Sequence, residues 1–298
     1  MIFRTSVDTR GTEKPNDIIM DESKTICLLR QEIKRLRKLL SETPPDLETL
    51  LKTRGLPIYK CEPDQDLLAP GTAHINGYYK KLIHYSFRIF LRDVIKRQEG
   101  FTITDVARFT STKVTAEYIT YLLEIGLLEQ LPNRIFRLLR RPIRSFGVTL
   151  EWFLSEIFKR EFGVEAKWGV KFRKPGIGGD YDLLAKINGS LIYMEIKSSP
   201  PKQIYPSEIA AFLERISELR PTITIFFMDT ELRMKDKIVP MFEAELPAWH
   251  SHPPEVRRIE KELFAIGNTL FIINAAGKIP ANIERVLIEH FRGTAQPL

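Results

Sequence analysis

Two carboxylates and a lysine stand close together in the second half of the 298-residue sequence, at Asp182, Glu195 and Lys197. Glu195 and Lys197 are two residues apart, so they share one face if their segment is a strand, because strand side chains alternate between faces. Asp182 lies in the apolar segment before them, and Asn188-Gly189 between the two segments is typical of a two-residue hairpin turn. The spacing therefore predicts that the three side chains converge on neighbouring strands.

Two carboxylates beside an ammonium group suit a divalent-cation site with a charge stabiliser next to it. Burying charge on apolar strands costs free energy, so a purely structural reason for such a set is uncommon. The alternative is a surface ion pair between Glu195 and Lys197, with Asp182 on an exposed hairpin. Asp180 competes with Asp182, because it lies on the same strand face two residues earlier.

Hydrophobic periodicity predicts the elements that position these residues. A helix, three strands, a helix and a strand are expected at residues 149–162, 165–173, 180–187, 191–197, 206–219 and 222–228. Helices at 233–245 and 254–266, a strand at 269–274 and a helix at 281–291 follow. The fold class expected for the C-terminal region is a mixed sheet flanked by helices, within a multidomain protein that combines α+β and α/β architecture.

This arrangement resembles the PD-(D/E)XK nuclease superfamily, which has the restriction-endonuclease-like fold. Glu195-Ile196-Lys197 matches the E-X-K half of the motif, and Asp182 matches the other half without its proline. The resemblance covers about residues 148–228 and continues more weakly to the C-terminus. It implies Mg²⁺ or Mn²⁺ bound by Asp182, Glu195 and the carbonyl of Ile196, with Lys197 positioning or activating the attacking water.

Many members of the superfamily also carry a glutamate on the helix that precedes the sheet. Glu151 fits this position better than Glu156, which lies too near the expected end of the helix at Gly163. Glu151 is therefore the fourth candidate catalytic residue, and Glu156 is kept as its alternative.

Residues 77–147 carry thirteen Lys and Arg against six Asp and Glu, an excess equal to the +7 of the whole chain. The pattern predicts helices at 78–98, 105–109 and 113–125 and a hairpin at 127–139 that turns at 131–134. Concentrated positive charge is typical of nucleic-acid binding, although solvated helix faces give the same composition.

The stretches Ile103–Ala107, Thr115–Ile119 and Leu122–Glu129 resemble a winged helix-turn-helix domain. The resemblance implies that the helix beginning at Lys113 enters the major groove and that the wing meets the DNA backbone. Five arginines in or after the wing would repel one another unless they are solvated or phosphates neutralise them. The predicted DNA-binding residues are Lys113, Arg134, Arg137, Arg140, Arg141 and Arg144. A winged helix that contacts protein is the alternative.

The N-terminal part divides into a flexible arm at 1–20 and a segment at 21–76 that combines an amphipathic helix, at 21–41, with a Pro-rich connector. The connector is expected to hold one short helix at 47–53. The amphipathic helix has an apolar seam at Ile26, Leu29, Ile33, Leu36 and Leu40. It could pack on its own chain or form a homodimer, and the sequence favours neither. The winged helix domain at 77–147 and the nuclease-like domain at 148–298 complete the expected division.

The composition is that of an ordinary globular chain, with 43% hydrophobic and 28% charged residues. No apolar run is long enough to span a membrane, and Cys27 and Cys61 suit a reducing, cytoplasmic location. The sequence thus predicts a cytoplasmic, metal-dependent endonuclease acting on duplex or branched DNA. The alternatives are a non-catalytic DNA-binding or regulatory protein on a nuclease-like scaffold and a winged-helix protein-interaction module.

Overall fold

The computed structural model describes residues 24–36, 44–173, 180–249 and 251–294. The chain divides into two compact units, Met1–Pro45 and Asp46–Leu298. Residues 24–36 of the first unit form a helix, whereas the expected arm at 1–20 and Leu40 lie outside the described residues. No helix in the described part is long and apolar enough to cross a membrane.

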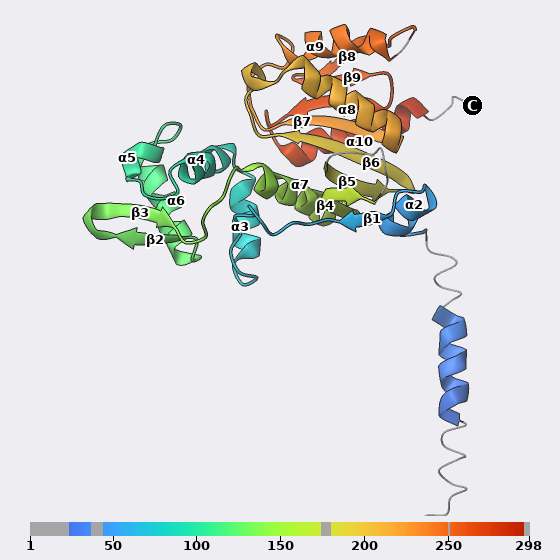
Figure 1. Ribbon diagram of the computed structural model, residues 1–298, viewed down its shortest axis with the longest axis horizontal. Helices are drawn as coiled ribbons and strands as arrows, with labels where there is room; N and C mark the ends of the chain where they lie inside the picture. The colour runs from blue at the N-terminus through green and yellow to red at the C-terminus, as the bar shows by residue number, and fades with distance from the viewer. Residues whose placement is uncertain (1–23, 37–43, 174–179, 250, 295–298) are drawn as a thin grey trace, which may run out of the picture. The chain divides into compact units, whose positions relative to one another are not determined.

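The second unit is built on an eight-stranded mixed sheet with the order β1-β4-β5-β6-β7-β10-β9-β8 (Figure 1). Strand β6 runs parallel to β7, which runs parallel to β10, and the other neighbours are antiparallel. The strands span Ile58–Lys60 (β1), Glu165–Phe172 (β4), Tyr181–Ile187 (β5), Ser190–Lys197 (β6), Ile223–Met228 (β7), Val256–Glu260 (β8), Leu263–Ile266 (β9) and Leu270–Asn274 (β10).

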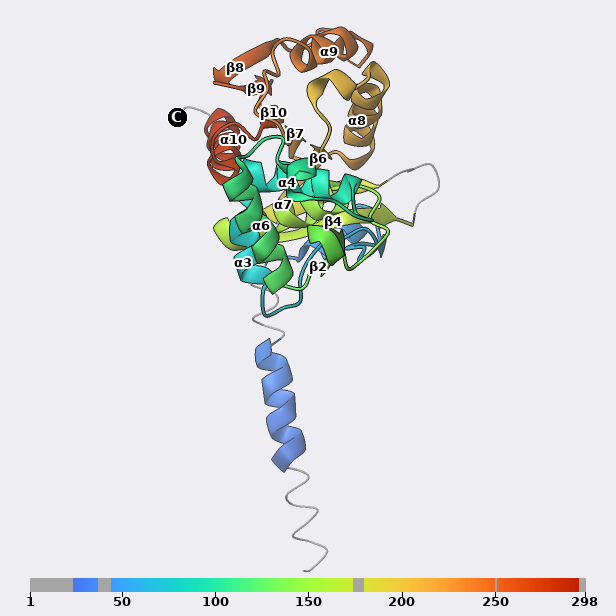
Figure 2. The same ribbon diagram turned by 90° about the vertical axis from the view of Figure 1, so that its left-hand side faces the viewer.

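Helices cover both faces of this sheet (Figure 2). One face packs against α7 (Gly147–Glu161) and α10 (Ile279–Thr294), and the other against α2 (Leu47–Thr53), α8 (Pro206–Leu219) and α9 (Ile238–Glu245). Strand β6 shows the alternation, because Ile192 and Met194 belong to the first core while Leu191 and Tyr193 belong to the second. Burial on both faces explains why the central strands are apolar almost throughout.

A helical module lies between α2 and the sheet in sequence. It comprises α3 (Ile75–Leu82), α4 (Tyr85–Lys96), α5 (Ile103–Val106), α6 (Thr112–Glu124) and a hairpin of β2 (Leu128–Leu131) and β3 (Ile135–Leu138), which turns through the short helix η1 (Pro132–Arg134). Ser111 caps α6 by accepting from the Val114 amide, and Gly126 follows that helix with a φ of +71°. The order of helices and hairpin agrees with the sequence prediction.

The helix expected at 78–98 is two helices, because the chain is extended at His84. Buried Arg88 explains the break: its Nη1 donates to the carbonyls of Leu82 and Ile83, at 2.7 and 3.0 Å. These carbonyls are thereby satisfied at the helix end.

The prediction of a helix at 254–266 is wrong. The segment forms the hairpin β8–β9, in which Lys261 has a φ of +43°. Leu263–Ile266 are buried one after another, as in a strand covered on both faces, and such a short apolar run does not distinguish strand from helix. The helix expected at 233–245 begins only at Ile238.

The segment expected to be a connector also contributes to the sheet. Strand β1 pairs with β4, and Leu47 and Leu51 of α2 are fully buried in the core beside Tyr181 and Tyr193. The short helix itself was predicted with its observed bounds. The remaining C-terminal elements lie within a few residues of their predicted positions.

Candidate functional site

Asp182 and Glu195 lie on the two neighbouring strands of the β5–β6 hairpin. Asn188 and Gly189 turn the chain with φ values of +50° and +76°, which an Asn-Gly turn adopts readily. Leu183 pairs with Met194 at the end of the β5–β6 ladder, and Asp182 and Glu195 are the next residues on the two strands. The Ile196 amide donates a hydrogen bond of 2.7 Å to Asp182 Oδ2. The hairpin therefore brings the two carboxylates close enough to interact.

Both oxygens of Glu195 are engaged by donors from its own strand and from α8. Lys197 Nζ lies 2.9 Å from Oε1, and Arg215 Nη1 lies 3.1 and 3.0 Å from Oε1 and Oε2. The Tyr193 hydroxyl also donates to Oε2. Glu195 itself is only 2% exposed. The sequence analysis missed Tyr193 and Arg215, although Tyr193 lies on the same strand face two residues before Glu195.

Lys197 contacts a second carboxylate, because Glu208 Oε2 of α8 lies 3.0 Å from its Nζ. Burial alone would lower the pKa of Lys197, but Glu195 and Glu208 outweigh it and raise that pKa above its ordinary value. Lys197 is therefore a protonated cation at neutral pH rather than a base.

Two carboxyl groups of the site have raised pKa values. Burial, with smaller contributions from Asp180 and Glu195, raises the pKa of Glu151 to about 7. Burial, followed by Glu195 and Glu151, raises the pKa of Asp182 well above its ordinary value, against the opposing effects of the Ile196 amide and Lys197. Like charges crowded in a partly dry site produce this pattern, which is common where carboxylates serve a function.

Gly169 of β4 lies between Pro63 and the carboxylate of Glu151. Its φ is +56°, and a Cβ atom there would lie 2.6 Å from Pro63 Cδ and 3.7 Å from Glu151 Oε2. Helix α7, which carries Glu151, packs on β4, β5 and β6. A side chain at Gly169 would therefore strain the backbone and clash with Pro63, while it would only touch Glu151.

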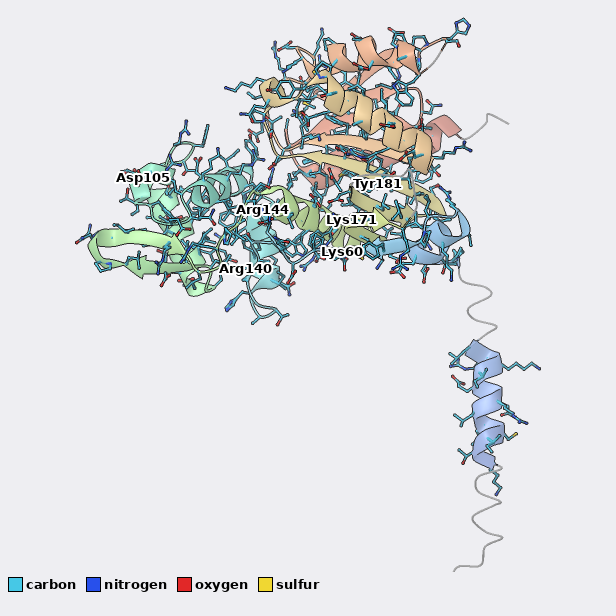
Figure 3. The ribbon with its side chains drawn as sticks, viewed as in Figure 1. Lys60, Asp105, Arg140, Arg144, Lys171 and Tyr181 are labelled. Atoms are coloured by element: carbon cyan, nitrogen blue, oxygen red, sulfur yellow. The ribbon has the colours of Figure 1, made fainter. Side chains whose placement is uncertain are left out.

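The two alternative acids have other partners. Asp180 pairs with Lys171 at 2.8 Å, on the β4–β5 part of the sheet where Figure 3 labels Lys171 and Tyr181, and its side chain is half exposed. Glu156 pairs with Lys159 and Arg160 at 3.4 and 2.7 Å. Asp182 thus lies near Glu195, whereas the alternative acids Asp180 and Glu156 both form ion pairs with basic residues.

The oxygen-only donor set fits a hard divalent cation in kind. A cation would also relieve the mutual repulsion that contributes to the raised pKa values of Asp182 and Glu151. Within the described residues, however, no group of three or more His, Cys, Asp or Glu side chains is placed to hold a metal ion. The contacts of Glu195 with Lys197 and Arg215 would compete with a metal for the same oxygens.

Four of the five arginines predicted to bind DNA are already paired with acids of the chain. Figure 3 labels Arg140 and Arg144, on the segment between the hairpin and α7. The pairs are Arg137–Glu129 at 2.7 Å, Arg140–Asp64 at 4.0 Å, Arg141–Glu99 at 3.2 Å and Arg144–Asp66 at 3.8 Å. Two of these partners, Asp64 and Asp66, come from the segment before the helical module.

Lys113 and Arg134 differ from those four. Both are exposed, and neither forms an ion pair with another described residue. Lys113 is the second residue of α6, and Arg134 lies at the turn of the hairpin with a φ of +58°. These two residues are the predicted contacts whose charge remains available to an anionic partner.

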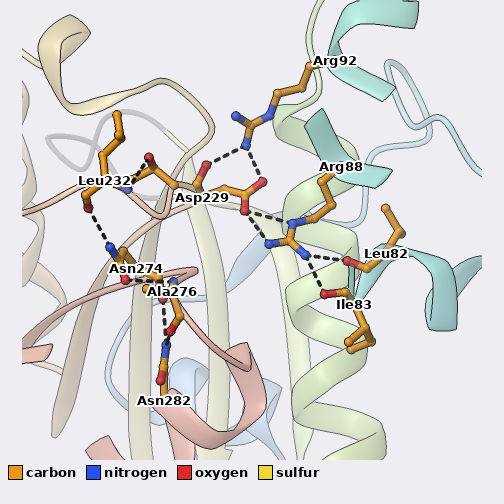
Figure 4. A network of polar contacts seen from close by, with 10 residues as sticks. Leu82, Ile83, Arg88, Arg92, Asp229, Leu232, Asn274, Ala276 and Asn282 are labelled. Carbon is orange, nitrogen blue, oxygen red and sulfur yellow. Dashed lines mark hydrogen bonds and ion pairs between the residues drawn. The ribbon is translucent and has the colours of Figure 1, made fainter. Parts of the chain in front are cut away.

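A buried ion-pair network joins α4 to the end of β7 (Figure 4). Arg88 Nε and Nη2 lie 2.9 and 2.8 Å from Asp229 Oδ1. Arg92 Nη2 contacts Asp229 Oδ2 and also donates a hydrogen bond of 3.0 Å to the backbone carbonyl of Asp229. Arg88 and Asp229 are 1% and 0% exposed. Two arginines of the basic segment therefore serve internal contacts between the helical module and the sheet.

No protein-family model matches the sequence, and no curated protein matches it. Among solved structures, the chain is similar to Can2 from Sulfobacillus thermosulfidooxidans in complex with cyclic tetra-adenylate, with 11% identity and a TM-score of 0.48 over 82% of this chain and 60% of that one. It is also similar to protein VC1899 from Vibrio cholerae, with 12% identity and a TM-score of 0.42 over 72% and 56% of the two chains. The chain thus spans less than two thirds of either neighbour, and at these values neither assigns a function.

Proposed function

We propose that the protein is a metal-dependent DNA endonuclease whose site is centred on Asp182 and Glu195. The observation that supports this proposal is that the two carboxylates lie close together on neighbouring strands β5 and β6, with protonated Lys197 beside Glu195. Charged groups on otherwise apolar strands cost free energy, which favours a functional reason for them.

In this proposal Asp182, Glu195 and the Ile196 carbonyl hold Mg²⁺ or Mn²⁺. The bound ion would polarise the scissile phosphate and lower the pKa of a coordinated water. Lys197 stabilises negative charge that develops on the phosphate. Glu151, whose pKa is about 7, is suited to accept a proton near neutral pH.

We further propose that residues 77–147 act as a winged helix that holds DNA for a nuclease domain at 148–298. The order α5, α6 and hairpin supports the comparison with winged helices, in which the second helix enters the major groove. Lys113 and Arg134 would contact phosphates directly. The four paired arginines would contact phosphates only by sharing or exchanging their present acidic partners; these are Arg137, Arg140, Arg141 and Arg144.

A plasmid-cleavage assay with Mg²⁺ or with EDTA tests this function. We expect the wild-type protein to cut only when the metal is present, and Asp182→Asn to bind DNA without cutting it. Asp180→Asn is the matched control, because it changes a carboxylate two residues away that pairs with Lys171. Full activity of the Asp182→Asn protein, or loss of activity only in Asp180→Asn, would contradict the assignment of the site.

One observation favours a second function. Arg215 and Lys197 already engage Glu195, as in a fold that has replaced a metal with internal ion pairs. A DNA-binding or regulatory protein on a nuclease-like scaffold would bind DNA equally well in Mg²⁺ and in EDTA and would leave the plasmid intact.

A further inference from the structure

A pocket of about 780 Å³ opens between α4 and the carboxyl ends of β6 and β7. Pro200 follows β6 in its wall, and Asp229 follows β7. Crevices at the carboxyl ends of parallel strands are the usual ligand sites of α/β sheets, and this volume lies in the range of small-ligand pockets. None of the residues proposed for catalysis lines it.

The pocket wall contains a buried carboxylate with an unused acceptor. Asp93 is 3% exposed, and its Oδ2 atom has no hydrogen-bond partner, while Oδ1 lies 4.0 Å from Lys96 Nζ. An unpaired buried carboxylate oxygen costs free energy, so the wall is suited to a ligand that donates a hydrogen bond to it.

The rest of the lining suits a flat ring with a phosphate attached. Tyr85 and Phe109 offer aromatic surfaces to the pocket. Phe109 is 65% exposed, so its ring is available for stacking. Lys96 is a largely exposed cation of the same wall. Asp229 is neutralised by Arg88 and Arg92, which leaves Glu231 at the exposed edge as the other acid of the lining beside Asp93. Aromatic stacking surfaces beside a cation are characteristic of sites for single-stranded nucleic acid.

We propose that this pocket receives an unstacked nucleotide of the DNA strand that is cut. The base stacks on Phe109 and Tyr85, its amino group donates to Asp93, and its phosphate lies near Lys96. This inference rests on the proposed function, because the pocket adjoins the candidate site: the Asp229 amide donates to the Lys197 carbonyl at 2.9 Å. The preferred substrate is therefore DNA with unpaired nucleotides beside the cut rather than uniform duplex.

The test is binding of labelled oligodeoxycytidine and oligodeoxyuridine of equal length, measured by fluorescence anisotropy with the full-length protein in EDTA. Cytosine carries an amino donor where uracil carries an acceptor. We expect about tenfold tighter binding of oligodeoxycytidine, the size of one hydrogen bond to a charged acceptor. In Asp93→Asn this ratio should fall to about threefold, because a neutral acceptor forms a bond about half as strong.

A second variant keeps the test independent of any folding defect at buried Asp93. Phe109→Ala removes an exposed ring, and it should weaken the binding of both oligonucleotides about tenfold through lost stacking. Asp236→Asn and Tyr59→Ala are matched controls, since both residues are exposed and neither lines the pocket. Both controls should bind like the wild type.

Equal binding of the two oligonucleotides by the wild type, or wild-type behaviour of both Asp93→Asn and Phe109→Ala, would overturn the pocket assignment. If free CMP displaced the oligonucleotide at an equal concentration, the pocket would not require a nucleotide within a DNA strand, and that part of the assignment would be overturned. Because binding is measured without metal, a protein that discriminates but never cuts contradicts only the proposed endonuclease. A protein that cuts DNA but binds the two oligonucleotides equally contradicts only the assignment of the pocket.

Discussion

Charge is distributed unevenly among the acids of the candidate site. Lys197 and Arg215 both contact Glu195, whereas neither Asp182 nor Glu151 forms an ion pair within the described chain. Both of these carboxyl groups have raised pKa values, chiefly because they are buried. This asymmetry makes pH a direct probe of the site.

The first prediction concerns Glu151. Its pKa in the folded protein is about 7, above the ordinary 4.5, so proton binding stabilises the fold. That stabilisation is complete below about pH 4.5 and is lost as the pH rises through about 7. The melting temperature of the wild type should therefore fall, relative to that of Glu151→Gln, between those pH values. Parallel curves for the two proteins would show that Glu151 has an ordinary pKa.

The residues of the site were predictable to the extent that they are close in sequence. Asp182, Glu195 and Lys197 lie on one hairpin, whose turn and alternation fix their relative positions. Arg215 lies on α8, and its contact with Glu195 depends on how that helix packs on the sheet. Likewise, Asp64 and Asp66 pair with arginines more than seventy residues away, which no local pattern indicates.

At the scale of the elements, Asp229 holds α4 against the carboxyl end of β7. Asp229→Ala would leave Arg88 buried without its partner, which typically costs about 3–5 kcal/mol. Urea unfolding should show this loss, whereas Asp236→Ala at an exposed position should change the free energy of unfolding little. A loss at Asp229 no larger than at Asp236 would mean that water satisfies Arg88.

The elements themselves were predicted best where periodicity and turn signals agree. The helix α8 has its predicted bounds, with Pro206 at its first position. The errors have local causes: Arg88 breaks the helix expected at 78–98, and the short run Leu263–Ile266 fits a strand as well as a helix. The pairing of β1 with β4 joins residues more than a hundred positions apart, so no local pattern indicates it.

At the scale of the whole molecule, the positive charge available to DNA is smaller than the composition suggests. Binding should weaken with salt by about 0.9 log units of affinity per log unit of salt for each phosphate neutralised. We expect Lys113→Ala with Arg134→Ala to flatten this slope by up to about 1.8. Arg137→Ala should flatten it less, because that side chain is shared with Glu129. An unchanged slope in the double variant would indicate that this surface contacts protein.

The helix at 24–36, taken by itself, carries a row of uncovered apolar side chains. Ile26, Leu29, Ile33 and Leu36 are between 45% and 57% exposed, an unfavourable arrangement for an isolated helix. We predict that these helices pair in a homodimer and that Leu29→Glu with Leu36→Glu yields monomers, because like charges would be buried at the seam. Analytical ultracentrifugation measures this. A monomeric wild type at micromolar concentration would refute the prediction.

The central claim is that Asp182 and Glu195 together hold a divalent cation, and titration calorimetry with Mn²⁺ tests it most directly. The wild type should bind the ion with heat that disappears in Asp182→Asn and in Glu195→Gln, while Asp180→Asn binds like the wild type. Release of protons on binding should accompany the wild-type reaction near neutral pH, because Glu151 and Asp182 have raised pKa values. The absence of Mn²⁺ binding by the wild type, or equal binding by Asp182→Asn, would contradict the account.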